Sequence, residues 1–175
     1  HQYGIIDDGF GTTPNVELAY GGALPSIWTS GYGDLVNILF NDQDGDTSLN
    51  LTLSADPGFE VGLFGFDLAS FSSAGQTLQG LQVRDSISDA TLFSQGLTFI
   101  TGTTHNDFDF IDGLFARRLT VDIDLTGLGT VSDNIGIDNV YFIQREVSPI
   151  PVPAAVWLFG PGLLCLIGLA RRKSS

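Results

Sequence analysis

Three aspartates with alternate spacing are the first group in this sequence that could do chemistry. Asp42, Asp44 and Asp46 lie in the segment Asn-Asp-Gln-Asp-Gly-Asp-Thr, between two apolar runs. Alternate carboxylates in a loop can converge on a hard cation such as Ca²⁺, which prefers oxygen ligands. The segment lacks flanking helices and a glutamate at the twelfth loop position, so it is not an EF-hand. A solvated turn is the favoured interpretation, and a calcium loop is the alternative.

A second acidic group depends on Asp138. Residues 135–143 alternate as a strand would, yet each face carries one polar residue, Asp138 or Asn139. Either one of the two side chains points inward, or a bulge between them switches the phase. A buried, unpaired carboxylate is very costly, and structural Ca²⁺ is one way to satisfy it, with Asp7 and Asp8 as co-ligands if the first and last strands are neighbours. A carboxylate that accepts backbone N–H bonds at a bulge is the favoured alternative.

Three aromatic residues are candidates for sugar binding. Trp28, Tyr20 and Tyr32 lie in a segment rich in glycine and proline, which predicts a loop over residues 20–32. Exposed aromatic rings in a loop can stack on sugar rings. The alternative is that these rings close the edge of the sheets.

Catalytic patterns are missing from the sequence. The two histidines are His1 and His105, and no Gly-x-Ser-x-Gly, His-Glu-x-x-His or glycine-rich phosphate loop occurs. A glycosidase needs only two carboxylates, which twenty acidic residues do not exclude, but nothing marks one pair as special. We therefore expect a protein that is not an enzyme.

The charge balance excludes one class of partner. Twenty acidic residues against seven basic ones give a net charge of −13, which repels phosphate backbones and argues against nucleic acid. Such a field attracts divalent cations or basic partners. Cys165 is the single cysteine, so neither an intrachain disulfide nor a cysteine-rich metal site is possible. The chain begins with His1 and contains no methionine, from which we expect a processed chain or a fragment.

The elements that would position these residues are strands. Residues 48–54 and 119–125 alternate apolar and polar side chains, and no stretch of ten or more residues in the first 145 shows a helical period. A phase switch near Leu63 predicts a β-bulge or a bend. Residues 1–146 therefore read as an all-β, antiparallel β-sandwich of the jelly-roll kind. The further strands predicted are 16–20, 35–40, 78–84, 90–95, 107–111 and 135–143.

The composition changes after Glu146. A proline-rich linker at 147–153 is followed by an uncharged run at 154–170 and a basic tail at 171–175. As a helix the uncharged run is roughly 25 Å long, at the short end of what crosses a hydrocarbon core. The sequence predicts a transmembrane helix with the basic tail in the cytoplasm and the acidic domain outside. The alternative is a buried helix of a soluble fold.

The C-terminal segment resembles a bacterial sorting signal. Its letters from Ile150 to Lys173 read IPVPAAVWLFGPGLLCLIGLARRK, which is similar to the PEP-CTERM class and, more narrowly, to its VPLPA variant. Ile150, Val152, Pro161 and Cys165 depart from that variant. The resemblance implies a Gram-negative bacterium, often one that makes exopolysaccharide, an exosortase as partner, and a location in the cell envelope or outside the cell. The residues that carry the signal are Pro151, Pro153, Ala154, Arg171 and Arg172.

The β-domain has a looser resemblance to the ectodomains that accompany this signal, through residues 5–11, 56–59, 66–68 and 135–140. The Asp138-Asn139 pair is similar to that of calcium-containing jelly rolls in the carbohydrate-binding and galactose-binding-like group. From these features we expect a structural or adhesive role in the extracellular matrix or biofilm. A carbohydrate-binding module that recognises exopolysaccharide is the alternative.

Overall fold

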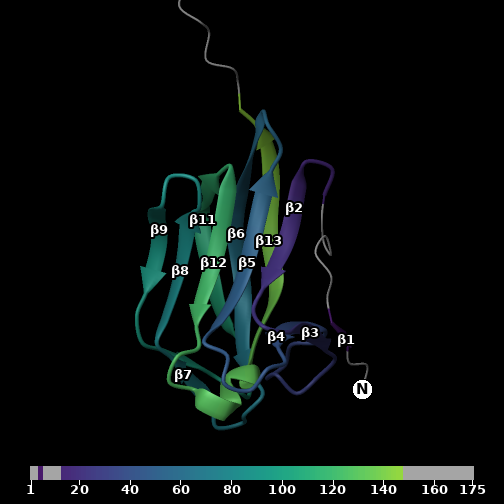
Figure 1. The fold of residues 1–175 in the computed structure, drawn as a ribbon, viewed down its shortest axis with the longest axis vertical. Coiled ribbons are helices and arrows are strands. Elements are labelled where there is room, and N and C mark those ends of the chain that lie inside the picture. Colours follow the sequence, from purple (N-terminus) through teal and green to yellow (C-terminus); the bar gives the residue numbers. More distant parts are fainter. Residues whose placement is uncertain (1–3, 6–12, 148–175) are drawn as a thin grey trace, which may run out of the picture.

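The domain is all-β, with antiparallel sheets, as the sequence predicts. The computed structural model describes residues 4–5 and 13–147. Two larger sheets face each other in a sandwich-like arrangement (Figure 1). One contains, in spatial order, β1 (Gly4–Ile5), β3 (Pro25–Trp28), β4 (Ile38–Asn41), β13 (Ile135–Glu146), β6 (Phe59–Ser70) and β11 (Asn106–Ala116). The other contains β2 (Val16–Gly21), β5 (Ser48–Ala55), β12 (Arg118–Asp124), β8 (Gly80–Asp85) and β9 (Ala90–Gln95).

Three short elements close one end of the sandwich. The strands β7 (Gln76–Leu78) and β10 (Thr98–Ile100) pair with each other, and the 3₁₀ helix η1 (Gly129–Asn134) precedes β13. In Figure 1 β7 and η1 lie together at the lower end of the sheets. The loop after β4 reaches the same end, since Gly45 donates its backbone N–H to the carbonyl of Gly129.

Strict alternation builds the main core. Leu49, Leu51 and Leu53 of β5 are buried, whereas the residues between them are partly exposed. Successive side chains of a strand point to opposite faces, so one leucine face is directed at the other sheet. There Leu63 and Phe66 of β6 belong to the same buried cluster. This packing removes apolar surface from water on both sheets, and that removal is the main source of stability for such a fold.

Both predicted bulges are present. In β6 Phe64 has no opposite residue on β13, because Leu63 pairs with Phe142 and Gly65 pairs with Tyr141. In β13 the register shifts between Asp138 and Tyr141. Each insertion switches which alternate residues face the core. Of the interpretations offered for residues 138 and 139, the bulge is therefore the one found.

Several boundaries differ from the prediction. The strand expected at 35–40 begins at Ile38, and the one expected at 78–84 is divided between β7 and β8. The loop expected over 20–32 is wrong, because β2 extends to Gly21 and β3 covers Pro25–Trp28. Pro25 is the first residue of its strand, a position where its missing N–H is tolerated.

The C-terminal predictions concern residues that the structure does not describe. The linker at 148–153, the apolar run at 154–170 and the basic tail all lie outside the described ranges. Within 4–5 and 13–147, no helix has both the length and the apolar character needed to cross a membrane.

Candidate functional site

A second, smaller core lies on the far side of β4 from the main one. Leu39 packs into the main core, while its neighbours Ile38 and Phe40 join a cluster with Tyr32 and Leu35. Both faces of β4 are thus buried, and all four of its residues have buried side chains. Trp28, at the end of β3, packs against this small core. The segment between β3 and β4 therefore covers one face of β4.

A cavity of about 240 Å³ opens beside the small core. Its walls are mostly aromatic, and its polar groups come from the loop after β4 and from η1. The aromatic pocket, as we call it, is lined by Trp28, Tyr32, Phe40, Asp42, Phe71, Asp133 and Asn134.

The rings of the aromatic pocket hold one another in place. Trp28 makes edge-on contacts with Phe40 and Phe71, at centroid separations of 6.3 and 6.4 Å. Tyr32 lies 5.4 Å from Phe71, and its hydroxyl donates to the backbone carbonyl of Asp133. Tyr32 is 3% exposed, whereas Phe71 is 47% exposed. Tyr32 and Phe40 are thus the buried floor, and Phe71 and the half-buried Trp28 are the accessible walls.

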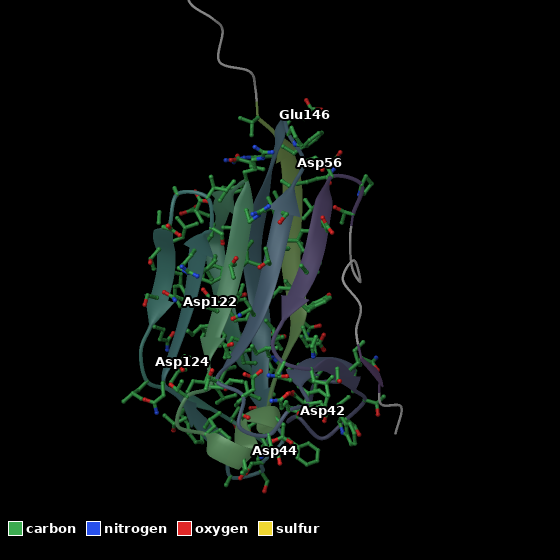
Figure 2. The ribbon with its side chains drawn as sticks, viewed as in Figure 1. Asp42, Asp44, Asp56, Asp122, Asp124 and Glu146 are labelled. Atoms are coloured by element: carbon green, nitrogen blue, oxygen red, sulfur yellow. The ribbon has the colours of Figure 1, made fainter. Side chains whose placement is uncertain are left out.

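Two carboxylates give the aromatic pocket its charge. Burial raises the pKa of Asp133, and the negative charges of Asp44 and Asp42 raise it further. Burial also raises the pKa of Asp42, with Asp44 again adding to the effect. Asp42 and Asp44 lie beside η1 at the lower end of the molecule (Figure 2). Hydrogen bonds hold the two elements together, since the Ser132 hydroxyl donates to the carbonyl of Gln43.

The third aspartate of the predicted calcium loop has a different role. Asp46 accepts hydrogen bonds from the backbone N–H of Ala23 at 2.8 Å and of Thr47 at 2.7 Å, and from the side-chain amide of Asn41. Burial acts to raise the pKa of Asp46, but these hydrogen bonds outweigh it and lower the pKa. Asp46 therefore organises the turn. In the part of the chain that the structure describes, Asp42, Asp44 and Asp46 do not bring ligand atoms within 4.8 Å of one another.

Asp138 belongs to a row of carboxylates across three strands. In the antiparallel register, Asp67 of β6 lies opposite Asp107 of β11 on one side and opposite Asp138 of β13 on the other. Like charges directly opposite one another destabilise a sheet. Burial raises the pKa of Asp138, and the charge of Asp67 adds to this. The side-chain amide of Asn139 donates to Asp67 at 2.7 Å, which offsets part of the repulsion.

His105 is the cationic partner of this row. Its Nδ1 lies 2.8 Å from Asp34, and its Nε2 lies 3.1 Å from Asp107 and 4.0 Å from Asp67. Asp67, His105 and Asp107 offer three ligand atoms within 4.8 Å of one another. Both ring nitrogens already face carboxylates, which is the geometry of an imidazolium that donates twice, and Ca²⁺ prefers oxygen ligands. The contacts are those of an ion-paired histidine.

Replacing His105 with glutamine should cost stability only at low pH. The hydrogen bond to Asp34 is the main reason that the pKa of His105 is raised above its usual 6.5, with the charges of Asp67 and Asp107 adding to it. The imidazolium therefore stabilises the fold fully below the unfolded pKa and loses this effect as the pH rises through the higher folded pKa. In denaturant unfolding, the variant should have a lower free energy of unfolding than the wild type below about pH 6. At about pH 9 the two values should agree. A difference that persists at the higher pH would contradict this assignment.

The other predicted residues are placed as follows. Tyr20 packs against the main core from β2 and lies apart from the aromatic pocket. Asp7, Asp8, Pro151, Pro153, Ala154, Arg171 and Arg172 are outside the described residues. Sequence reasoning missed Phe71, Asp133 and Asn134, which lie far along the chain from Trp28 and have no motif that marks them.

A larger, polar hollow of about 580 Å³ lies on the outer face of β5, β12 and β8. Its side chains include Asn50, Arg84, Asp122 and Asp124, and Arg84 pairs with Asp122 at 2.8 Å. Figure 2 shows Asp122 and Asp124 along β12. Because Arg84 already neutralises the charge of Asp122, this hollow is less suited to a charged ligand than the aromatic pocket is.

No protein-family model matches the chain, and a search of curated proteins finds no significant match.

Proposed function

We propose that this chain is an exported bacterial surface protein with a structural or adhesive role in the extracellular matrix or biofilm, processed by an exosortase. The observation that carries the proposal is the order of a proline-rich spacer, an uncharged run and the cluster Arg171-Arg172-Lys173. A transmembrane helix at 154–170 would hold the protein at the membrane before processing. The net charge of −13 favours solubility outside the cell and gives no affinity for nucleic acid.

The geometry of the domain supports this arrangement. Glu146, the last residue of β13, is labelled at the opposite end of the molecule from Asp42 and Asp44 in Figure 2. A chain held through residues that follow Glu146 would therefore present the aromatic pocket away from the point of attachment. Such an orientation suits a domain that makes contacts with its surroundings.

Cell fractionation tests the sorting proposal. The full chain, behind a signal peptide, is expected in the envelope or the medium, and a chain that lacks residues 149–175 should lose envelope retention. A variant in which Arg171, Arg172 and Lys173 become glutamine separates the basic tail from the apolar run. Identical distribution of all three proteins would contradict the proposal.

A carbohydrate-binding module is the second candidate, and the aromatic pocket favours it. Trp28 and Tyr32, both candidates for sugar contact, line one cavity, together with Asp42. Sugar sites combine aromatic walls with a few polar groups that fix the orientation of the ring. A glycan array with the full chain should show saturable binding that is lost in Trp28→Ala and kept in Tyr141→Ala, an exposed aromatic outside the pocket. Turnover of a polysaccharide would contradict a purely binding role.

Structural calcium remains a proposal for Asp7, Asp8 and Asp138. Its support is the high density of aspartate, whose mutual repulsion a divalent cation would offset. Binding to the folded state alone adds about 2.7 kcal/mol when free calcium is a hundred times the Kd. Melting in millimolar calcium should therefore occur at a visibly higher temperature than in EDTA, and Asp138→Asn should abolish the difference. Sensitivity lost only in Asp44→Asn would move the site to the loop, and identical wild-type curves would end the proposal.

A further inference from the structure

We propose that the aromatic pocket binds a positively charged amino-sugar unit of a polysaccharide, with the ammonium group at Asp42 and Asp133 and the sugar ring against Trp28 and Phe71. This inference rests on the glycan-binding function proposed above and adds to it the chemical class of the ligand. The reasons are the charge of the cavity, the nature of its walls and its size.

The aromatic pocket is anionic. Asp42 and Asp133 line it, with Asp44 close enough to raise the pKa of both. No arginine or histidine of the described residues lines the cavity. Three basic side chains form ion pairs with acidic residues that do not line the pocket. These pairs are Arg84 with Asp122, Arg145 with Glu60, and His105 with Asp34 and Asp107. A cation is thus the group that would relieve the repulsion among the three carboxylates.

The aromatic walls of the pocket also favour a positively charged ligand. An ammonium group over the face of a tryptophan or phenylalanine ring is attracted by the ring quadrupole. Trp28 is half-buried and Phe71 is half-exposed, so both offer ring surface to a ligand. Tyr32 and Phe40 hold these rings from below through ring contacts of 5.4–6.3 Å. The walls are therefore organised before a ligand arrives, which lowers the entropic cost of binding.

A sugar ring can make more kinds of contact with this pocket than a free amine can. The apolar face of a sugar ring can stack on an aromatic wall while its hydroxyl groups meet a polar side chain such as Asn134. A lysine side chain offers the ammonium group but no ring and no hydroxyl group. The cavity of about 240 Å³ is smaller than the roughly 300–1,000 Å³ of sites that enclose a drug-sized ligand. It therefore fits a single sugar unit or a chain end.

Calorimetric titration of the full chain with four probes tests the inference. The probes are a tetramer of glucosamine, a tetramer of N-acetylglucosamine, a tetramer of glucose and a tetramer of lysine. At low ionic strength the glucosamine tetramer should bind about tenfold more tightly than either neutral tetramer, because a cation–π contact and an ion pair with a carboxylate together correspond to roughly that factor. The preference should weaken with salt, which screens charges.

Matched variants separate the pocket from the overall negative charge. Asp42→Asn and Asp133→Asn should remove the preference for glucosamine, whereas Asp124→Asn, which removes the same charge from a residue that does not line the pocket, should keep it. An equal loss in Asp124→Asn would overturn the inference in favour of general charge attraction.

Each remaining outcome has a distinct meaning. Equal affinity for all three sugar tetramers would overturn the amino-sugar inference while leaving glycan binding intact. Tighter binding of the lysine tetramer than of glucosamine would overturn the assignment to a sugar. If no tetramer binds, both the inference and the carbohydrate-binding function are wrong.

Discussion

Gly33→Ala is expected to destabilise the domain by about 2–4 kcal/mol and to weaken ligand binding at the aromatic pocket. Gly33 has a φ of +56°, in the left-handed region, and a β-carbon there would lie 1.9 Å from the backbone oxygen of Thr104. Real β-carbons do not approach so closely, and a backbone oxygen cannot swing away as a flexible side chain would. One of the two segments must therefore move.

The consequence extends to the site because of where Gly33 lies. The preceding residue, Tyr32, forms the floor of the aromatic pocket, and the following one, Asp34, pairs with His105. A displaced backbone at position 33 should therefore disturb both contacts. Thermal or chemical unfolding measures the stability, and titration with the tetramers described above measures the binding.

Gly45→Ala is the control for this prediction. Gly45 also has a positive φ, of +79°, but a β-carbon there would meet nothing within 4 Å. It should therefore cost only the strain of the left-handed conformation, about 1 kcal/mol. An equal loss of stability in Gly33→Ala and Gly45→Ala would show that the close approach to Thr104 does not contribute to the free energy of unfolding.

Phe66→Ala is expected to cost about 3–5 kcal/mol, the usual range for removing a phenylalanine from a core. Phe66 is 1% exposed in β6 and stacks on Phe108 of β11 at a centroid distance of 5.2 Å. It also contacts Phe110 at 6.1 Å. The substitution removes the buried ring and leaves a cavity between the two sheets, and both effects reduce the free energy of unfolding. Unfolding in urea, with the slope checked for two-state behaviour, measures the loss.

The matched control is Phe99→Ala, which removes the same ring from a site that is 57% exposed. Because most of that ring already faces water, we expect a loss of less than about 1 kcal/mol. Comparable losses at the two positions would contradict the assignment of Phe66 to the core.

The sequence alone determined the class of fold and the places where its strands are irregular. The leucines of β5 and the apolar residues of β12 alternate strictly, and this period of two has one structural solution, a half-buried strand. The phase switches at Phe64 and at Asp138–Asn139 were detectable for the same reason, because an extra residue reverses the faces of everything that follows. These are local properties, since each depends on neighbours within a few residues.

Only the tertiary structure decided which side chains meet. Trp28 and Asp133 line one cavity although about a hundred residues separate them, and no spacing rule relates them. Asp67 faces Asp107 and Asp138 because of the register between three strands that are far apart in the chain. The predicted loop over 20–32 was wrong for a related reason: glycine and proline weaken a strand, but pairing with β4 outweighs that local preference. Register and pairing depend on how two sheets bury their apolar faces together, which is a property of the whole chain.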